Sequence, residues 1–341
     1  MHPGDRQVTQ AATILGCEGL SLSPDEKRFF AEAQPWGFIL FARNINDPAQ
    51  VAALTAELRE SVGWEAPVLI DQEGGRVQRM RAPHWREWHP PLDMVARASD
   101  PARALYLRYR LIAEELRAVG IDVQCGPTAD VARAETHPFL QNRLYGTDPD
   151  TVIDLCNAVA EGLTDGGIHP VVKHIPGHGA ATVDSHHDLP RVSLDRGTLD
   201  ATDFAVFAEM DHIMMGMTAH VVFEAIDPDR PATLSPDVMK VIREDIDFDG
   251  LLMTDDLSMN ALPGTIADRA AAARKAGCDM VLHCNGDRAE MEQVLANCGQ
   301  LSGAAQARAD TVIARRPEPQ PLDIQAAERD LSALLGGEVY V

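Results

Sequence analysis

Residues 66–76 read APVLIDQEGGR, an unbroken apolar run that changes abruptly to charged residues and glycine. Apolar runs of this kind are typical of strands buried on both faces, as in parallel sheets. Seven comparable runs occur elsewhere in the chain, and most are followed by a segment of helical character. They lie at 11–15, 36–41, 120–124, 169–173, 212–216, 251–254 and 280–284.

The segments between these runs carry signals for helix starts. Residues 23–26 (SPDE) and 47–50 (DPAQ) each place a capping side chain first, proline next and Glu or Gln at the third helical position. This arrangement satisfies the free amides of a helix N-terminus. Eight strand-then-helix units predict an α/β fold, a single (β/α)8 TIM-type barrel. A doubly wound open sheet is the structural alternative.

The chain length fits one such barrel, so we expect residues 1–341 to form a single catalytic domain. Its core is expected at about 10–300, with a C-terminal extension at about 301–341. Within that extension, 317–321 (PEPQP) is expected to be extended and 323–336 to form a last surface helix.

Composition excludes some classes of partner. The chain has 30 Lys and Arg against 52 Asp and Glu, a net charge of −22, and 45% hydrophobic residues. Nucleic acids and anionic membrane surfaces both require clustered positive charge, so neither is an expected partner. The hydrophobic content is sufficient for a large core, which argues against disorder. The expected partner is a small molecule, and we expect a monomer.

No targeting signal is visible in the chain. The first residues, MHPGDRQVTQAATILG, lack a basic region followed by a long apolar stretch, and no run approaches the roughly 18 apolar residues of a membrane helix. The six cysteines are scattered without CxxC spacing, which is typical of reduced, buried thiols. These features predict a cytoplasmic protein.

Charged and polar residues gather where the predicted strands end. In a barrel the carboxyl ends of the strands and the loops after them carry the active site, so these residues are candidates for function. Ordinary loop charges explain any one of them but explain the whole set poorly. In chain order they are Asp71, Gln72, Glu73, Arg76, Arg79, Asp130, Arg143, Lys173, His174, His220, Asp255 and Asp256.

The stretch 173–190, KHIPGHGAATVDSHHDLP, allows three interpretations. It is a polar surface loop, a metal site that uses His174 and His178, or a general acid/base pair. Ligands four residues apart share a face only on a helix, which the proline and glycines here disfavour. In an extended segment residues two apart point the same way, so Asp184 reaches the imidazole of His186. A carboxylate there raises the basicity of the ring, which favours the third interpretation.

Asp255 is the candidate nucleophile for such a pair. It ends the apolar run GLLMT (250–254), and a rigid strand would hold its carboxylate in the barrel mouth. A helix N-cap is the structural alternative for this residue. Asp256, the next residue, should point elsewhere and act as a structural hydrogen-bond acceptor.

Four motifs together resemble the single-domain β-N-acetylglucosaminidases of glycoside hydrolase family 3, which recycle bacterial cell-wall fragments. They are DQEGGRVQR (71–79), KHIPGHG (173–179), DSH (184–186) and TDDLSM (254–259), and the resemblance spans about residues 10–300. It implies that Asp255 is the nucleophile, with His186 as acid/base and Asp184 as its partner. It also implies a set of residues that hold the terminal N-acetylglucosamine: Asp71, Arg79, Arg143, Lys173 and His174.

The sequence departs from the family pattern at three places. Ile175 stands where an aromatic residue is usual, and Leu144-Tyr145 follow Arg143 in place of Ser or Ala and Phe. His187-Asp188 replace more variable positions. None of these departures falls on an expected catalytic group.

A nucleophilic carboxylate with an acid/base predicts double displacement with retention at the anomeric carbon. The implied substrate is the terminal N-acetylglucosamine of 1,6-anhydro-muropeptides, and neither a cofactor nor a metal is expected. Phosphate in place of water would make the enzyme a phosphorylase. A metal-dependent hydrolase that uses His174, His178 and His186 is a further alternative, as is a muropeptide-binding sensor without catalysis.

Overall fold

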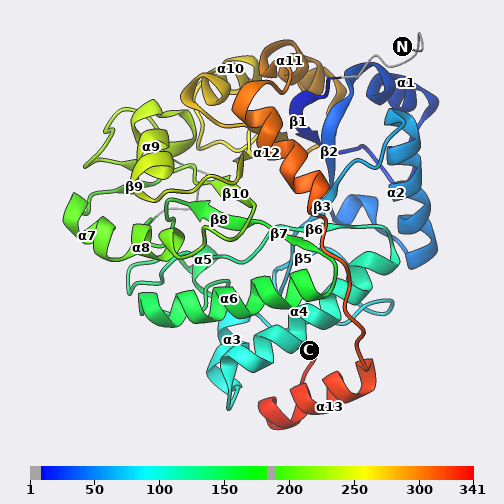
Figure 1. Cartoon of the computed structure of the whole chain (residues 1–341), viewed down its shortest axis with the longest axis vertical. Coiled ribbons are helices and arrows are strands. Elements are labelled where there is room, and N and C mark those ends of the chain that lie inside the picture. The colour runs from blue at the N-terminus through cyan, green and yellow to red at the C-terminus, as the bar shows by residue number, and fades with distance from the viewer. Residues whose placement is uncertain (1–8, 183–188) are drawn as a thin grey trace.

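The computed structural model describes residues 9–182 and 189–341, and its centre is a parallel sheet surrounded by helices (Figure 1). In spatial order the nine strands of this sheet run β7-β6-β3-β2-β1-β13-β12-β10-β8, and every pairing is parallel. The strands are β1 (Ala11–Leu15), β2 (Pro35–Leu40), β3 (Val68–Ile70), β6 (Val123–Gln124), β7 (His169–Pro170), β8 (Val172–Ile175), β10 (Met215–Thr218), β12 (Leu251–Asp256) and β13 (Met280–His283).

The sheet closes into a barrel because its two outermost strands, β7 and β8, follow each other directly in the chain. Only Val171 separates β7 from β8; β7 pairs with β6 on one side, whereas β8 pairs with β10 on the other. A bridge between Thr128 and Lys173 adds a contact across the same seam. The nine strands therefore occupy eight positions around a ring, which confirms the predicted (β/α)8 barrel and excludes the open sheet.

The first and last strands of the barrel also meet. Thr13 of β1 is opposite Val281 of β13. At the start of β1, the Ala12 amide donates to Gly299 O at 2.9 Å, and the Leu301 amide donates to Gln10 O at 3.0 Å. The start and the end of the barrel core are thus hydrogen-bonded neighbours.

Helices cover the outside of the ring, and several begin as their sequences predict. Ser23 and Glu26 form a capping box at the start of α1, and Asp47 accepts from the Gln50 amide at the start of α2. The helices of the structure are α1 (Pro24–Ala33), α2 (Pro48–Val62), α3 (Pro91–Arg97), α4 (Pro101–Ala118), α5 (Pro138–Gln141), α6 (Pro149–Asp165), α7 (Arg196–Ala201), α8 (Asp203–Ala208), α9 (Pro236–Lys240), α10 (Ile266–Ala276), α11 (Arg288–Cys298), α12 (Gly303–Ala314) and α13 (Ile324–Leu335). None in the described ranges is long and apolar enough to cross a membrane.

Apolar side chains fill the barrel and the layer between the strands and the helices. The interior cluster includes Ile14, Leu69 and Met253, all fully buried. Ala309 and Val312 of α12 belong to the same cluster, so this helix closes the barrel at the amino ends of its strands. All six cysteines are buried and free, as the sequence predicts.

After α12 the chain continues to α13, which packs against α4 (Figure 1). This helix confirms the surface helix expected at 323–336. Arg86 links this region to the barrel through ion pairs with Glu115 at 2.8 Å and Glu328 at 2.7 Å. The extension is thereby fixed to the segment that follows the 71–79 motif.

Two small sheets, which are not apparent from the sequence pattern, lie outside the barrel ring. β4 (Gln72–Gly74) and β5 (Val77–Gln78) form an antiparallel hairpin directly after β3. β9 (Arg191–Val192) pairs in parallel with β11 (Val222–Phe223). The hairpin folds the 71–79 motif back over the barrel mouth.

Candidate active site

A cavity of about 260 Å³ lies at the carboxyl ends of the barrel strands. Six of the catalytic and sugar-binding residues expected from the sequence line it: Asp71, Arg79, Arg143, Lys173, His174 and Asp255. The cavity also contacts Asp256, Phe41, Phe139 and Arg76. The position of the cavity is the one expected for the active site of a barrel.

Different elements bring these side chains together. Asp71 follows β3 directly, Lys173 and His174 belong to β8, and Asp255 is the second-to-last residue of β12. Arg143 arrives from further away, two residues beyond α5. Parallel strands place all their carboxyl ends at one edge, so residues distant in sequence meet there.

The hairpin after β3 depends on Gly74. This residue has φ of +112°, and a Cβ on it would clash with Nη2 of Arg108 and lie 2.6 Å from His89 O. Only glycine fits both the backbone angle and the available space. The glycines of the 71–79 motif thus let the chain turn back so that Arg79 returns to Asp71.

Asp71 joins two cations at the floor of the cavity. Its Oδ1 accepts from Lys173 Nζ at 2.8 Å, and its Oδ2 accepts from Arg79 Nη2 at 3.0 Å. Burial alone would raise the pKa of Asp71, but Lys173 and Arg79 outweigh it and lower the pKa. The Arg79 guanidinium also lies over the Phe41 ring, 4.7 Å from its centroid. Asp71 is therefore an anion fixed in one orientation.

Glu73 is a further functional candidate, to which the sequence assigned no role of its own. Its carboxylate accepts two hydrogen bonds from Arg143, each of 2.8 Å, and lies 2.7 Å from Lys173 Nζ. Burial would raise the pKa of Glu73, but Arg143 and Lys173 lower it to about 2. The cations of the site are thus balanced by Asp71 and Glu73. The position of Glu73, two residues after Asp71 at the end of a strand, was the signal for this role.

His174 is oriented by Asp130, which lies beyond β6. The Nδ1 of His174 is 2.8 Å from Asp130 Oδ2, and Asp130 Oδ1 accepts from the His178 amide at 2.6 Å. A carboxylate partner requires a proton on Nδ1, so Nε2 of a neutral His174 is an acceptor. Burial lowers the pKa of His178 to about 4, so that ring is neutral near pH 7.

Asp255 and Asp256 have different surroundings although they are adjacent. The Asp256 amide donates to Asp255 Oδ1 at 2.8 Å. Burial would raise the pKa of Asp255, but nearby histidines and this amide lower it, which keeps the carboxylate ionised. Asp256 Oδ1 accepts from the amides of Ser258 and Cys284, as a structural acceptor would. No helix begins directly after Asp255, so it is not an N-cap.

Asp184 and His186, the expected acid/base pair, lie outside the described residues, as do His187 and Asp188. The described chain resumes at Leu189 and pairs Arg191 with Val222 in the small sheet. Across residues 9–182 and 189–341, no three His, Cys, Asp or Glu side chains are grouped so that they could hold a metal ion.

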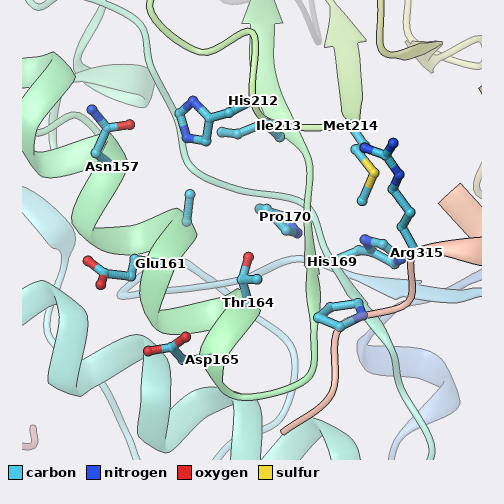
Figure 2. Close-up of a pocket in the computed structure, with 12 residues that line it drawn as sticks. Asn157, Glu161, Thr164, Asp165, His169, Pro170, His212, Ile213, Met214 and Arg315 are labelled. Atoms are coloured by element: carbon cyan, nitrogen blue, oxygen red, sulfur yellow. The ribbon is translucent and has the colours of Figure 1, made fainter. Parts of the chain in front are cut away.

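A second cavity, of about 380 Å³, lies at the amino ends of β7 and β10, and Figure 2 shows residues that line it. Glu161 and Thr164 come from α6, His169 begins β7, and Arg315 follows α12. Burial lowers the pKa of His169 to about 4, and its Nε2 lies 3.0 Å from Val312 O. None of the selected catalytic or sugar-binding residues lines this cavity. Because barrel chemistry occurs at carboxyl ends, the smaller cavity is the candidate active site.

Comparisons with known proteins agree with this geometry. Residues 10–315 match the glycosyl hydrolase family 3 N terminal domain. A β-hexosaminidase of Alkalilimnicola ehrlichii is 37% identical over 280 residues, which cover 80% of each protein. A β-hexosaminidase of Tolumonas auensis is 35% identical over 281 residues, which cover 80% of this chain and 82% of that protein.

Solved structures give the same picture. NagZ from Neisseria gonorrhoeae, in complex with N-trifluoroacetyl-D-glucosamine, has a TM-score of 0.78 and 28% identity. The match covers 96% of this chain and 98% of that one. A family 3 β-N-acetylglucosaminidase from Paenibacillus has a TM-score of 0.80 and 31% identity, covering 97% of this chain but 62% of that longer chain.

Proposed function

Because the chain belongs to glycoside hydrolase family 3, as its motifs predict, we propose that it is a retaining exo-β-N-acetylglucosaminidase that works through a covalent glycosyl ester on Asp255. One observation carries this proposal. The ionised Asp255 carboxylate shares a cavity with a fixed set of sugar-binding groups, among them Asp71 and Lys173. A binding protein would have no need for an ionised carboxylate at that position.

The cavity has groups suited to a terminal sugar. Arg79, Arg143 and Lys173 offer several N–H donors to hydroxyls and to an acetamido oxygen, and Asp71 offers acceptors. The ion pairs with Asp71 and Glu73 fix these donors before the sugar arrives, which lowers the entropic cost of binding. The complex of the Neisseria protein with an N-acylated glucosamine supports the same sugar for this chain.

The reaction proceeds in two displacements. In the first, Asp255 attacks the anomeric carbon, the bond to the leaving oxygen breaks, and protonated His186 gives its proton to that oxygen. In the second, His186 takes a proton from water, the water oxygen attacks the same carbon, and the ester to Asp255 breaks. Two inversions give net retention. Asp184 orients the imidazole and stabilises its charged form.

The proposed substrate class is a β-linked N-acetylglucosamine at the non-reducing end of a cell-wall muropeptide, which places the enzyme in peptidoglycan recycling in the cytoplasm. The family resemblance of the four motifs supports this role. The charged groups that line the cavity support binding of the terminal sugar, whereas the identity of the aglycone rests on that resemblance.

The test compares release of p-nitrophenol from its β-N-acetylglucosaminide and its β-glucoside, for the native chain and for Asp255→Ala. We expect turnover of the first substrate only, and loss of turnover in the variant. Adding azide to Asp255→Ala should give an α-glycosyl azide, because the small anion enters in place of the missing carboxylate. Product of inverted configuration from the native enzyme, or full activity without Asp255, would refute the proposal.

A further inference from the structure

A chain of three buried side chains joins the end of β10 to the end of β12. Thr218 is the last residue of β10, His220 follows two residues later, and Thr233 lies in a short 3-10 turn, Ala232–Leu234. All three are fully buried. The Oγ1 of Thr233 is 2.8 Å from that of Thr218 and 2.7 Å from Nδ1 of His220. The chain ends at the Asp256 carbonyl, 3.0 Å from His220 Nε2.

The proton on each atom of this chain follows from its partners. The Asp256 carbonyl can only accept, so Nε2 of His220 carries a proton. Burial lowers the pKa of His220, so the ring is neutral near pH 7 and its Nδ1 needs a donor. The Thr233 hydroxyl is that donor, and Thr218 donates in turn to Thr233. Ala219 O, at 3.0 Å, competes for the Thr233 proton but is further away than Nδ1.

Hydrogen bonds consequently hold both the backbone carbonyl and the side-chain carboxylate of Asp256. His220 fixes its carbonyl, while its carboxylate accepts from the amides of Ser258 and Cys284 at 3.1 and 3.2 Å. The Asp256 amide, held in this position, donates to Asp255 Oδ1 at 2.8 Å. Within the described part of the chain, Oδ2 of Asp255 accepts no hydrogen bond, so it is the oxygen left for attack.

We propose that Thr233 and His220 are positioning residues for the nucleophile. They fix the carbonyl of Asp256 and, through its α-carbon, the preceding peptide, whose amide holds Oδ1 and thereby aims Oδ2 of Asp255 at the anomeric carbon. Neither residue lines the cavity. The inference rests on the proposed function, since it assigns Asp255 as nucleophile. A misplacement of about 1 Å at a reacting group can cost roughly 10²-fold in rate, so the effect should be large.

The experiment measures how fast the glycosyl ester forms on Asp255. A 5-fluoro glycosyl fluoride of N-acetylglucosamine traps this ester, and intact mass with peptide mapping follows it. Thr233→Val removes the hydroxyl but nearly keeps the shape, and should slow trapping about 10- to 100-fold with little change in KM. Thr233→Ser keeps the donor and should trap at close to the native rate.

Thr55→Val is the matched control. Thr55 is also buried, and its hydroxyl donates to Val119 O at 2.8 Å, but it lies on α2 outside the barrel. We expect a comparable fall in Tm with a native rate of trapping. Equal trapping rates in Thr233→Val and Thr55→Val would overturn the positioning role. Absence of an adduct on Asp255 in the native enzyme would instead overturn the proposed function.

A second pair of variants covers the case in which Thr233→Val does not fold. Glutamine places its amide nitrogen near the position of Nε2, so His220→Gln keeps the donor to Asp256. Asparagine is too short to do so. We expect faster trapping in His220→Gln than in His220→Asn, and equal rates would refute the inference.

Discussion

Glu73 and Arg143 are joined by two parallel hydrogen bonds, from Nε to Oε2 and from Nη2 to Oε1, each of 2.8 Å. Both side chains are buried, with Glu73 1% and Arg143 7% exposed. The same carboxylate is 2.7 Å from Lys173 Nζ. One anion therefore fixes two of the cations that line the cavity, although it does not line the cavity itself.

Glu73→Gln should weaken both substrate binding and folding. The amide keeps the shape but leaves Arg143 without its charge partner, and losing one member of a buried pair costs about 3 kcal/mol. We expect KM for the aryl N-acetylglucosaminide to rise roughly tenfold, equivalent to about 1.4 kcal/mol. Steady-state kinetics and thermal denaturation measure the two effects.

Glu115→Gln is the control for this change. Glu115 is also mostly buried and pairs with an arginine, Arg86, at 2.8 Å, but on α4 and away from the cavity. It should lower Tm without a change in KM. A normal KM in Glu73→Gln would show that Arg143 does not need this carboxylate to bind the sugar.

The free energy of unfolding should fall in acid, partly because the Glu73 carboxylate becomes protonated. Its pKa in the folded chain is about 2, below the ordinary value of 4.5. A lowered carboxyl pKa stabilises the fold fully above the ordinary value, and this contribution is lost as the pH falls towards the folded value. We expect the free energy of unfolding to decline between about pH 5 and pH 2, and less steeply in Glu73→Gln. Urea denaturation at several pH values tests this, and identical slopes would contradict it.

His186→Ala should discriminate between leaving groups. General acid catalysis typically contributes about 10²–10⁴-fold, so a substrate with a sugar leaving group should lose that much in kcat/KM. An activated aryl glycoside needs little protonation and should lose much less. Rates on both substrates check this, and equal losses would remove His186 from the role of acid.

Substitutions in the cavity at the amino ends of the strands should leave catalysis intact. Arg315 and His212 both line it and are exposed. Exposed substitutions usually change stability by no more than about 0.5 kcal/mol. We expect Arg315→Ala and His212→Ala to keep kcat/KM within about twofold of the native value. A loss above tenfold in either variant would place part of the chemistry at this end.

The barrel was predictable because each strand is an apolar run whose pattern depends only on local sequence. Residues 251–254 and 280–284 correspond to β12 and β13 almost residue for residue. The interruption at Val171 was not predictable, since it arises where one strand must pair with different neighbours at its two ends. The hairpin after β3 was missed because its strands are only two or three residues long.

The candidate site was predictable where a charged residue follows an apolar strand, as Asp71 and Asp255 do. Glu73 lies in the same motif, yet its role depends on Arg143, which is 70 residues away. His220 was selected from the sequence, but Thr233 was not, because a lone threonine in a turn carries no signal of its own. Such roles depend on contacts between residues that are distant in sequence, which only the folded structure reveals.

The meeting of Gln10 with Leu301 and of Ala12 with Gly299 has a topological consequence. The barrel core is a closed loop of chain in which the first and last residues are already in contact. A circular permutant that joins these ends through a short linker would preserve every strand pairing but would lose α12, which closes the barrel at the amino ends of its strands. New termini could be placed in the exposed loop at Gly63, between α2 and β3. The carboxyl ends of the strands, and the cavity that they form, would then stay intact.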